Sequence, residues 1–148
     1  SCATGNDGFS VKSVSLSEGR TEVWKFEATN KCMKANGYAN QKNNPAQSML
    51  VSPAFSLEGL TTATLTFKQA AKHMKNAADE LQVLASTDGT NWTKLNMSAM
   101  PDGSNWNLIS TTCDLSAFAG KATVYIAFQY TSTTEAAPEW RVNNVVVK

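Results

Sequence analysis

The sequence has few of the residues that build catalytic and metal centres. Its 148 residues include a single histidine, His73, and three cysteines without a CxxC pair. These counts exclude the usual zinc sites. The sequence also lacks a Gly-x-Ser-x-Gly elbow, a family-like cysteine context, and Walker or dinucleotide glycine loops. We therefore predict that the chain is not an enzyme.

Charge and long hydrophobic runs are also scarce. Only 17% of the residues are charged and the formal net charge is +1, with no Lys/Arg cluster. Binding to a nucleic acid backbone needs a basic footprint, so we expect no nucleic acid partner. The longest apolar runs, such as Val145–Val147, fall far short of the roughly 20 residues that cross a bilayer. We expect no transmembrane segment.

The three cysteines allow at most one disulfide. Cys2, beside a small residue, fits either the lipid-bearing cysteine of a bacterial lipoprotein or a domain edge, and no apolar stretch precedes it. Cys32 and Cys113 lie in strand-like segments. We prefer to interpret both as small buried hydrophobic residues.

The length and the hydrophobic pattern predict one all-β domain over residues 1–148. Short runs with two-residue alternation recur between clusters of Gly, Asn, Asp, Ser and Pro, which is typical of a two-sheet antiparallel β-sandwich. We expect no helix longer than a turn or two. The predicted strands are Phe9–Val14, Glu22–Phe26, Lys31–Ala35, Ser48–Ser52, Thr62–Ala70, Glu80–Ser86, Trp92–Asn96, Asn107–Cys113, Ala122–Tyr130 and Glu139–Val147.

The clearest alternation lies in the strand that ends at Tyr130. Val124, Ile126, Phe128 and Tyr130 fall on one face of it, which we predict to be core. Similar alternation and turn patterns predict the positions of further aromatic residues. We expect Trp24, Phe67 and Trp140 in the core, Trp106 at the start of a strand, and Trp92 as a lid over the sandwich edge after an Asp88-Gly89 hairpin.

Asp79 and Glu80 are the adjacent acids of the chain. Neighbours on a strand point to opposite faces, so this pair cannot flank one glycosidic bond as a hydrolase requires. We interpret it as a solvated pair at the start of a strand.

The best candidates for ligand contact lie in a polar loop. An aromatic ring offers a flat apolar surface to a sugar, and Tyr38 is the aromatic residue that we expect to be most accessible. Amides that can bond hydroxyl groups stand beside it at Asn40, Gln41 and Asn43, and we add His73 as an exposed residue at a loop edge. Loops are also simply polar, which is the alternative.

Five segments in order resemble the cleaved-adhesin, or choice-of-anchor, jelly-roll family. Each is a weak β pattern alone, and the ordered set spans roughly residues 9–148. The resemblance implies a galactose-binding-like jelly roll. The segments are Val23–Phe26 with Met33–Tyr38, Leu50–Leu57, Ser86–Trp92, Asp114–Tyr130 and Trp140–Val147.

The resemblance also implies a function. Members of this family are adhesin modules of secreted proteases and surface lipoproteins of host-associated bacteria, with proposed carbohydrate or host-protein binding. We therefore expect a non-catalytic carbohydrate-binding or adhesion module at the extracellular or outer surface of a bacterium, within a longer chain. The alternative is a structural spacer or protein-interaction domain without a small ligand of its own.

A structural calcium ion is the one cofactor that the resemblance implies. Calcium needs several oxygen ligands, and the acids of this chain are scattered without EF-hand spacing. Relatives commonly have an acidic residue followed by His where this chain has Lys68 and Gln69, and an acidic residue at Asn143. The candidate ligands are Asp7, Asp79, Glu80 and Asp114.

Overall fold

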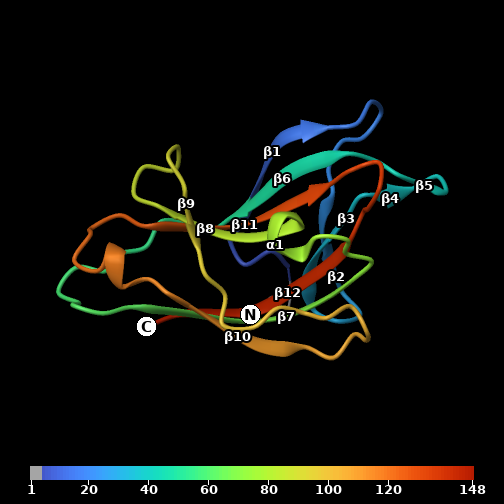
Figure 1. The fold of residues 1–148 in the computed structure, drawn as a ribbon. Helices are drawn as coiled ribbons and strands as arrows, with labels where there is room; N and C mark the ends of the chain where they lie inside the picture. Colours follow the sequence, from blue (N-terminus) through green and yellow to red (C-terminus); the bar gives the residue numbers. More distant parts are fainter. Residues whose placement is uncertain (1–4) are drawn as a thin grey trace.

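The computed structural model describes residues 5–148 and consists of two stacked antiparallel β-sheets (Figure 1). One sheet has the strand order β1-β6-β11-β8-β9 and the other β10-β7-β12-β3-β2, while β4 and β5 form a separate hairpin. This confirms the predicted all-β jelly-roll sandwich. The elements are β1 (Ser10–Leu16), β2 (Trp24–Glu27), β3 (Cys32–Asn36), β4 (Tyr38–Ala39), β5 (Lys42–Asn43), β6 (Ala46–Val51), β7 (Thr64–Lys72), α1 (Ala77–Glu80), β8 (Leu81–Ser86), β9 (Thr93–Leu95), β10 (Ile109–Asp114), the 3₁₀ helix η1 (Ser116–Phe118), β11 (Tyr125–Ser132) and β12 (Glu139–Val147).

The core lies between the two sheets, where the alternating residues of β11 meet those of β7 and β12. Val124, Ile126, Phe128 and Tyr130 are all buried, as predicted. The Phe128 ring stands edge-on to Phe67 at 5.0 Å and to Trp140 at 5.8 Å between ring centroids. Such edge-to-face contacts between the sheets fix their spacing.

Buried cysteines confirm another prediction. Cys32 and Cys113 are both buried, and burial raises the pKa of the Cys113 thiol to about 11. The lipoprotein hypothesis rests on Cys2, which lies outside the described residues.

The interpretation of Asp79 and Glu80 as a solvated strand pair was wrong for Glu80. Both residues lie in the one-turn helix α1, and Glu80 is 5% exposed. Its carboxylate accepts backbone hydrogen bonds from Lys75 and Asn76 at 2.8 and 2.7 Å. These two hydrogen bonds offset the cost of burying the carboxylate. They also close the turn that precedes the helix.

Two turns show how the chain reverses. The Asp88 carboxylate accepts the backbone amides of Thr90 and Asn91, both at 2.8 Å, as expected for the 87–92 loop. The second turn joins β4 to β5 through Asn40 and Gln41, whose φ angles of 54° and 62° are those of a type I′ hairpin. We had predicted a loop there, and the structure has a short hairpin.

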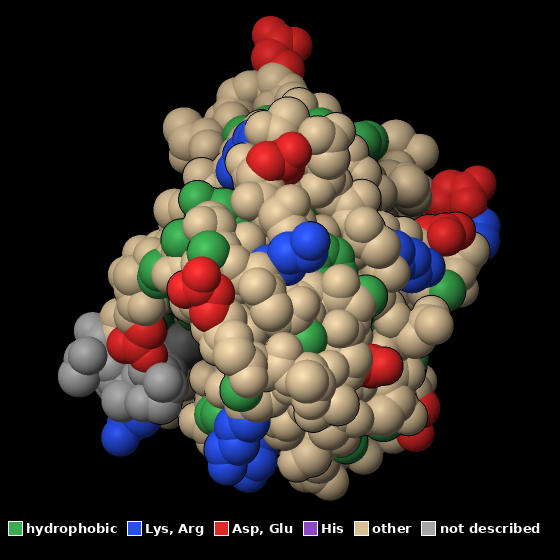
Figure 2. All heavy atoms as spheres, turned by 90° about the vertical axis from the view of Figure 1, so that its left-hand side faces the viewer, with side chains coloured by type: hydrophobic (Ala, Val, Ile, Leu, Met, Phe, Trp, Pro, Cys, Tyr) green, Lys and Arg blue, Asp and Glu red, His purple; other side chains and the backbone are tan. Residues whose placement is uncertain are grey.

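The two ends of the sandwich differ. The β4–β5 hairpin projects at one end, and the 87–92 loop lies at the other (Figure 1). On the latter end, Figure 2 shows acidic and basic side chains interspersed and hydrophobic ones scattered. The candidate site described next lies at the hairpin end. Within residues 5–148, no helix has the length and apolar character needed to cross a membrane.

Candidate functional site

A hollow of about 340 Å³ lies beside the β4–β5 hairpin, and we call it the Tyr38 hollow. The structure brings three of the five predicted ligand residues together in its walls: Tyr38, Asn43 and His73. Asn40 and Gln41 form the hairpin turn and are not part of its lining. The other lining residues are Asn36, Glu135, Ala136, Ala137 and Glu139.

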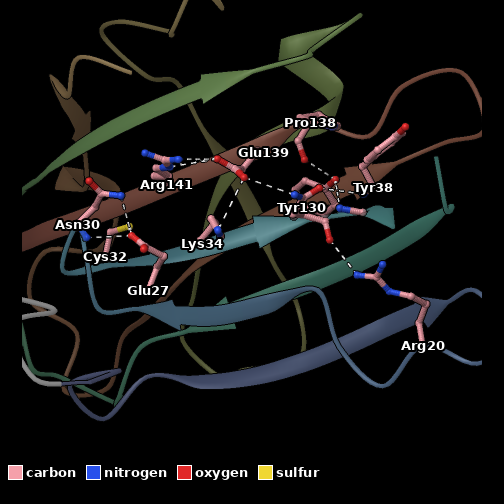
Figure 3. Close-up of polar contacts among 12 residues, drawn as sticks. Arg20, Glu27, Asn30, Cys32, Lys34, Tyr38, Tyr130, Pro138, Glu139 and Arg141 are labelled. Atoms are coloured by element: carbon pink, nitrogen blue, oxygen red, sulfur yellow. Dashed lines mark hydrogen bonds and ion pairs between the residues drawn. The ribbon is translucent and has the colours of Figure 1, made fainter. Parts of the chain in front are cut away.

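Tyr130 connects this hairpin to the core (Figure 3). Its hydroxyl accepts a hydrogen bond from the Gly37 amide at 2.8 Å and donates one to the Pro138 carbonyl at 2.6 Å. Burial raises the pKa of Tyr130 to about 12, so the hydroxyl keeps its proton. One buried group therefore links the start of the hairpin to the segment 135–138 on the other side of the hollow.

Gly37 and Asn44 close the base of the hairpin. A Cβ atom at Gly37 would lie 2.5 Å from the Ser132 hydroxyl oxygen and 2.9 Å from that of Tyr130, so no larger residue fits without a shift. The Asn44 carboxamide donates to the carbonyls of Gly37, Ala39 and Lys42 at 3.0 to 3.1 Å. This network holds Tyr38 at a fixed place although its side chain is 53% exposed.

The polar walls of the Tyr38 hollow are also partly fixed. The Tyr38 amide donates to the Asn36 carboxamide oxygen at 2.8 Å, and Asn43 donates to the Thr134 carbonyl at 3.2 Å. His73 is exposed and has a φ of 67° at the end of β7. The hollow thus combines one accessible ring with amide and imidazole groups that can bond hydroxyl groups.

Both carboxylates of the hollow are ion-paired. Glu139 accepts two hydrogen bonds from Arg141, at 2.8 and 3.1 Å, and Lys34 lies 3.8 Å away (Figure 3). Glu135 pairs with Lys75, and this hydrogen bond lowers its pKa. A general acid of a glycosidase needs a raised pKa, and Glu135 has the opposite shift.

A second hollow, of about 420 Å³, lies on the other side of Tyr38, and we call it the Arg20 hollow. It shares Asn36 and Tyr38 with the first. Its remaining lining residues are Gly19, Arg20, Thr21, Glu22, Val23, Lys25, Lys34 and Ala39.

The predicted calcium ligands are spread over the molecule. Among residues 5–148, no three His, Cys, Asp or Glu side chains group closely enough to hold an ion. Glu80 binds backbone amides, as described above. Asp114 interacts with the Ser116 side chain and accepts the Ser116 amide at 2.8 Å, and these two hydrogen bonds lower its pKa. Calcium binding through Asp7, Asp79, Glu80 and Asp114 stays a prediction.

The other aromatic residues occupy structural positions. Trp24, Phe67, Phe128 and Trp140 are buried as predicted. Trp92 packs against Met49, Leu84 and Ala127 on the outer face of a sheet, not on its edge as we had expected. Trp106 lies before β10, and the Arg141 guanidinium covers its ring at 3.9 Å from the centroid. Tyr38 is therefore the aromatic ring at the site that is accessible to a ligand.

Sequence reasoning missed Arg20, Asn36, Glu139 and Arg141. The strand register brings them together, since Asn36 faces Glu139 and Lys34 faces Arg141 across β3 and β12. The outward alternation of Glu139 and Arg141 in the last strand was the only available signal, and it did not reveal their neighbours.

Comparison with known proteins finds similar solved structures and no similar family model or curated sequence. No protein-family model matches the sequence, and no curated protein matches it. The K1 cleaved adhesin domain of Lys-gingipain from Porphyromonas gingivalis W83 aligns with a TM-score of 0.59 and 19% identity over 97% of this chain and 95% of that domain. A CBM4 domain aligns with a TM-score of 0.56 and 16% identity, covering 100% and 99% of the two chains. The N-terminal cellulose-binding domain of β-1,4-glucanase C from Cellulomonas fimi aligns at 0.53 and 17% identity, covering 100% and 92%.

These structures define the class of the protein. The chain is a jelly-roll β-sandwich of the kind found in cleaved-adhesin and carbohydrate-binding modules, which confirms the predicted resemblance at the level of the fold. Function has to be argued from the site, because one fold serves many functions.

Proposed function

We propose that this protein is a non-catalytic carbohydrate-binding or adhesion module of a secreted or surface-exposed bacterial protein. The observation that carries the proposal is the Tyr38 hollow, in which an exposed ring stands beside amide and imidazole groups on a rigid base. Solved structures of the same fold that are adhesin and carbohydrate-binding modules support it.

The chemistry of the hollow suits a sugar. A pyranose ring presents C–H groups on one face, which pack on an aromatic ring, and hydroxyl groups at its rim, which need donors and acceptors. Tyr38 supplies the ring. Asn36, Asn43 and His73 supply polar groups, and a hollow of about 340 Å³ accommodates one or two sugar units.

A glycan array followed by isothermal titration tests the proposal. We expect binding to at least one bacterial, host or plant glycan, weakened about tenfold by Tyr38→Ala, since truncation of an aromatic residue at the centre of a binding site commonly costs about 1–2 kcal/mol. The matched control is Tyr125→Ala, which removes a half-buried ring on the other sheet. Binding that is equal in Tyr38→Ala and wild type would place the glycan elsewhere.

A second observation favours the spacer or protein-interaction function. An apolar hollow of about 250 Å³ is lined by Phe9, Pro53, Phe55, Val145 and Val147, among others. Exposed apolar concavities often receive a neighbouring protein surface. Absence of binding to every glycan on the array, together with binding of a neighbouring domain of the parent chain that Val147→Asp abolishes, would favour this function.

A further inference from the structure

Three cations line the Arg20 hollow, and within residues 5–148 only Lys34 among them has a carboxylate at ion-pair distance, Glu139 at 3.8 Å. Arg20 donates to the main-chain carbonyls of Asn36 at 2.9 Å and of Glu22 at 3.5 Å, and within residues 5–148 it forms no ion pair. Carbonyl acceptors orient the guanidinium without neutralising it. The orientation is visible in Figure 3, where Arg20 reaches toward the base of the hairpin.

Two lysines add to this charge. Lys25 is exposed on β2 and has no ion-pair partner in the part of the chain that the structure describes. Lys34 faces Lys25 across the β2–β3 pair, and its Nζ is 3.8 Å from the Glu139 carboxylate. Like charges that face each other across strands are unfavourable, so an anion between them would stabilise this arrangement.

Among the residues that the structure describes, Glu22 is the one acid that lines the Arg20 hollow, and its carboxylate is hydrogen-bonded within the protein. The carboxylate accepts hydrogen bonds from the Ser13 and Ser48 hydroxyls and from the amides of Val23 and Trp24. Burial alone would raise its pKa, and these four donors together lower it. The Glu22 carboxylate is therefore held by local donors, and within residues 5–148 it forms an ion pair with none of the three cations.

Tyr38 stands between the two hollows and lines both. A sugar ring packed on Tyr38 would have one edge at the neutral amides of the Tyr38 hollow and the other at the cations of the Arg20 hollow. We infer that the site binds an acidic glycan, with the carboxylate of a uronic-acid unit held by Arg20, Lys25 and Lys34. This inference rests on the proposed function and names its ligand class.

We test the acidic-glycan inference by amide chemical-shift titrations at low ionic strength. One titration uses trigalacturonate and the other its neutral counterpart, galactotriose. We expect trigalacturonate to bind at least about tenfold more tightly, with shifts at residues 20–25 and 34–39, and to weaken steeply as salt is added. Lys25→Gln, at an exposed residue outside the Tyr38 hollow, should weaken trigalacturonate about threefold without changing galactotriose binding. Arg20→Gln should weaken trigalacturonate about tenfold.

The controls separate this inference from the proposed function. Lys94→Gln removes a cation on the opposite sheet and should leave all binding unchanged, and melting curves establish that each variant is folded. Equal affinity for the two sugars, insensitive to Lys25→Gln, would overturn the acidic-glycan inference and leave the carbohydrate-binding proposal standing. Inorganic phosphate that binds as tightly as trigalacturonate would also overturn it, because the site would then select charge alone. Failure of every sugar, in this titration and on the array, would remove both.

Discussion

Tyr130 belongs to the core and to the site at once. Its ring ends the inward row of β11, and its hydroxyl holds Gly37 and Pro138 on the two sides of the Tyr38 hollow. A buried hydroxyl with one donor and one acceptor partner is fully used, so its removal leaves two main-chain groups without partners.

Replacement Tyr130→Phe should therefore destabilise the protein by about 1–3 kcal/mol and loosen the hairpin. Urea denaturation gives the free energy of unfolding, and hydrogen exchange of the 37–44 amides reports the hairpin. Tyr125→Phe, on the outer face of the same strand, is the control. Unchanged exchange in Tyr130→Phe would show that the hydroxyl does not hold the hairpin.

Glu22 makes stability depend on pH. Its pKa is lower in the folded protein than the ordinary value near 4.5, because four hydrogen bonds favour the charged form. The stabilisation is complete above that ordinary value and is lost as the pH falls through the folded pKa. We expect Glu22→Gln to cost about 1 kcal/mol at pH 7, with allowance for partial solvent exposure, and less at about pH 3.

Urea denaturation of wild type and Glu22→Gln at the two pH values measures this gap. Glu18→Gln, an exposed acid in the same loop, should leave stability unchanged at both. A gap that widens toward acid pH would contradict the assigned role of Glu22.

At the scale of elements, the β4–β5 hairpin is the piece that sequence reasoning missed. Its strands have two residues each, too short to show alternation, and Asn40-Gln41 is not one of the usual type I′ pairs. Longer elements were predictable: β11 and β7 alternate over several residues, and their inward faces agree with prediction. The four-residue helix α1 agrees with the expectation of no helix longer than a turn or two, but Glu80 was assigned to the following strand because a buried acid gives no apolar signal.

The hairpin turn offers a direct test at this scale. Gln41 has a φ of 62°, a conformation that costs an L-residue about 1 kcal/mol and glycine little. Gln41→Gly should therefore raise the free energy of unfolding by up to about 1 kcal/mol, measured by thermal and urea melts. Glu18→Gly, at a residue without positive φ, should be neutral or destabilising. A loss of stability in Gln41→Gly would show that the hairpin has another conformation.

At the scale of the whole molecule, the site is assembled from segments far apart in sequence. Glu139 pairs with Asn36 on β3 and with Lys72 on β7, so the segments that carry Tyr38 and His73 leave these strands beside each other at one end of the sandwich. Composition and alternation predict the sandwich, yet they carry no information on register between distant strands. Tyr38, Asn43 and His73 were therefore predictable as exposed polar candidates, and their charged neighbours were not.

Packing between the two sheets makes the core between them one unit. Phe128 contacts Phe67, Trp140 and Phe9, so it bridges the two sheets. Phe128→Ala should cost about 3–5 kcal/mol, a large share of the stability of a domain of this size. Val14→Ala, at a position 55% exposed, should cost little. Urea denaturation compares the two, and similar costs would contradict a core centred on Phe128.

The central claim is that the hairpin end of this jelly roll binds a glycan through Tyr38. Amide chemical-shift mapping of the labelled protein with the strongest ligand from the array tests it most directly. The account predicts shifts confined to residues 20–25, 34–44, 73 and 135–139, and their loss in Tyr38→Ala. Shifts confined to the 87–92 loop and β9, at the opposite end of the sandwich, would contradict it.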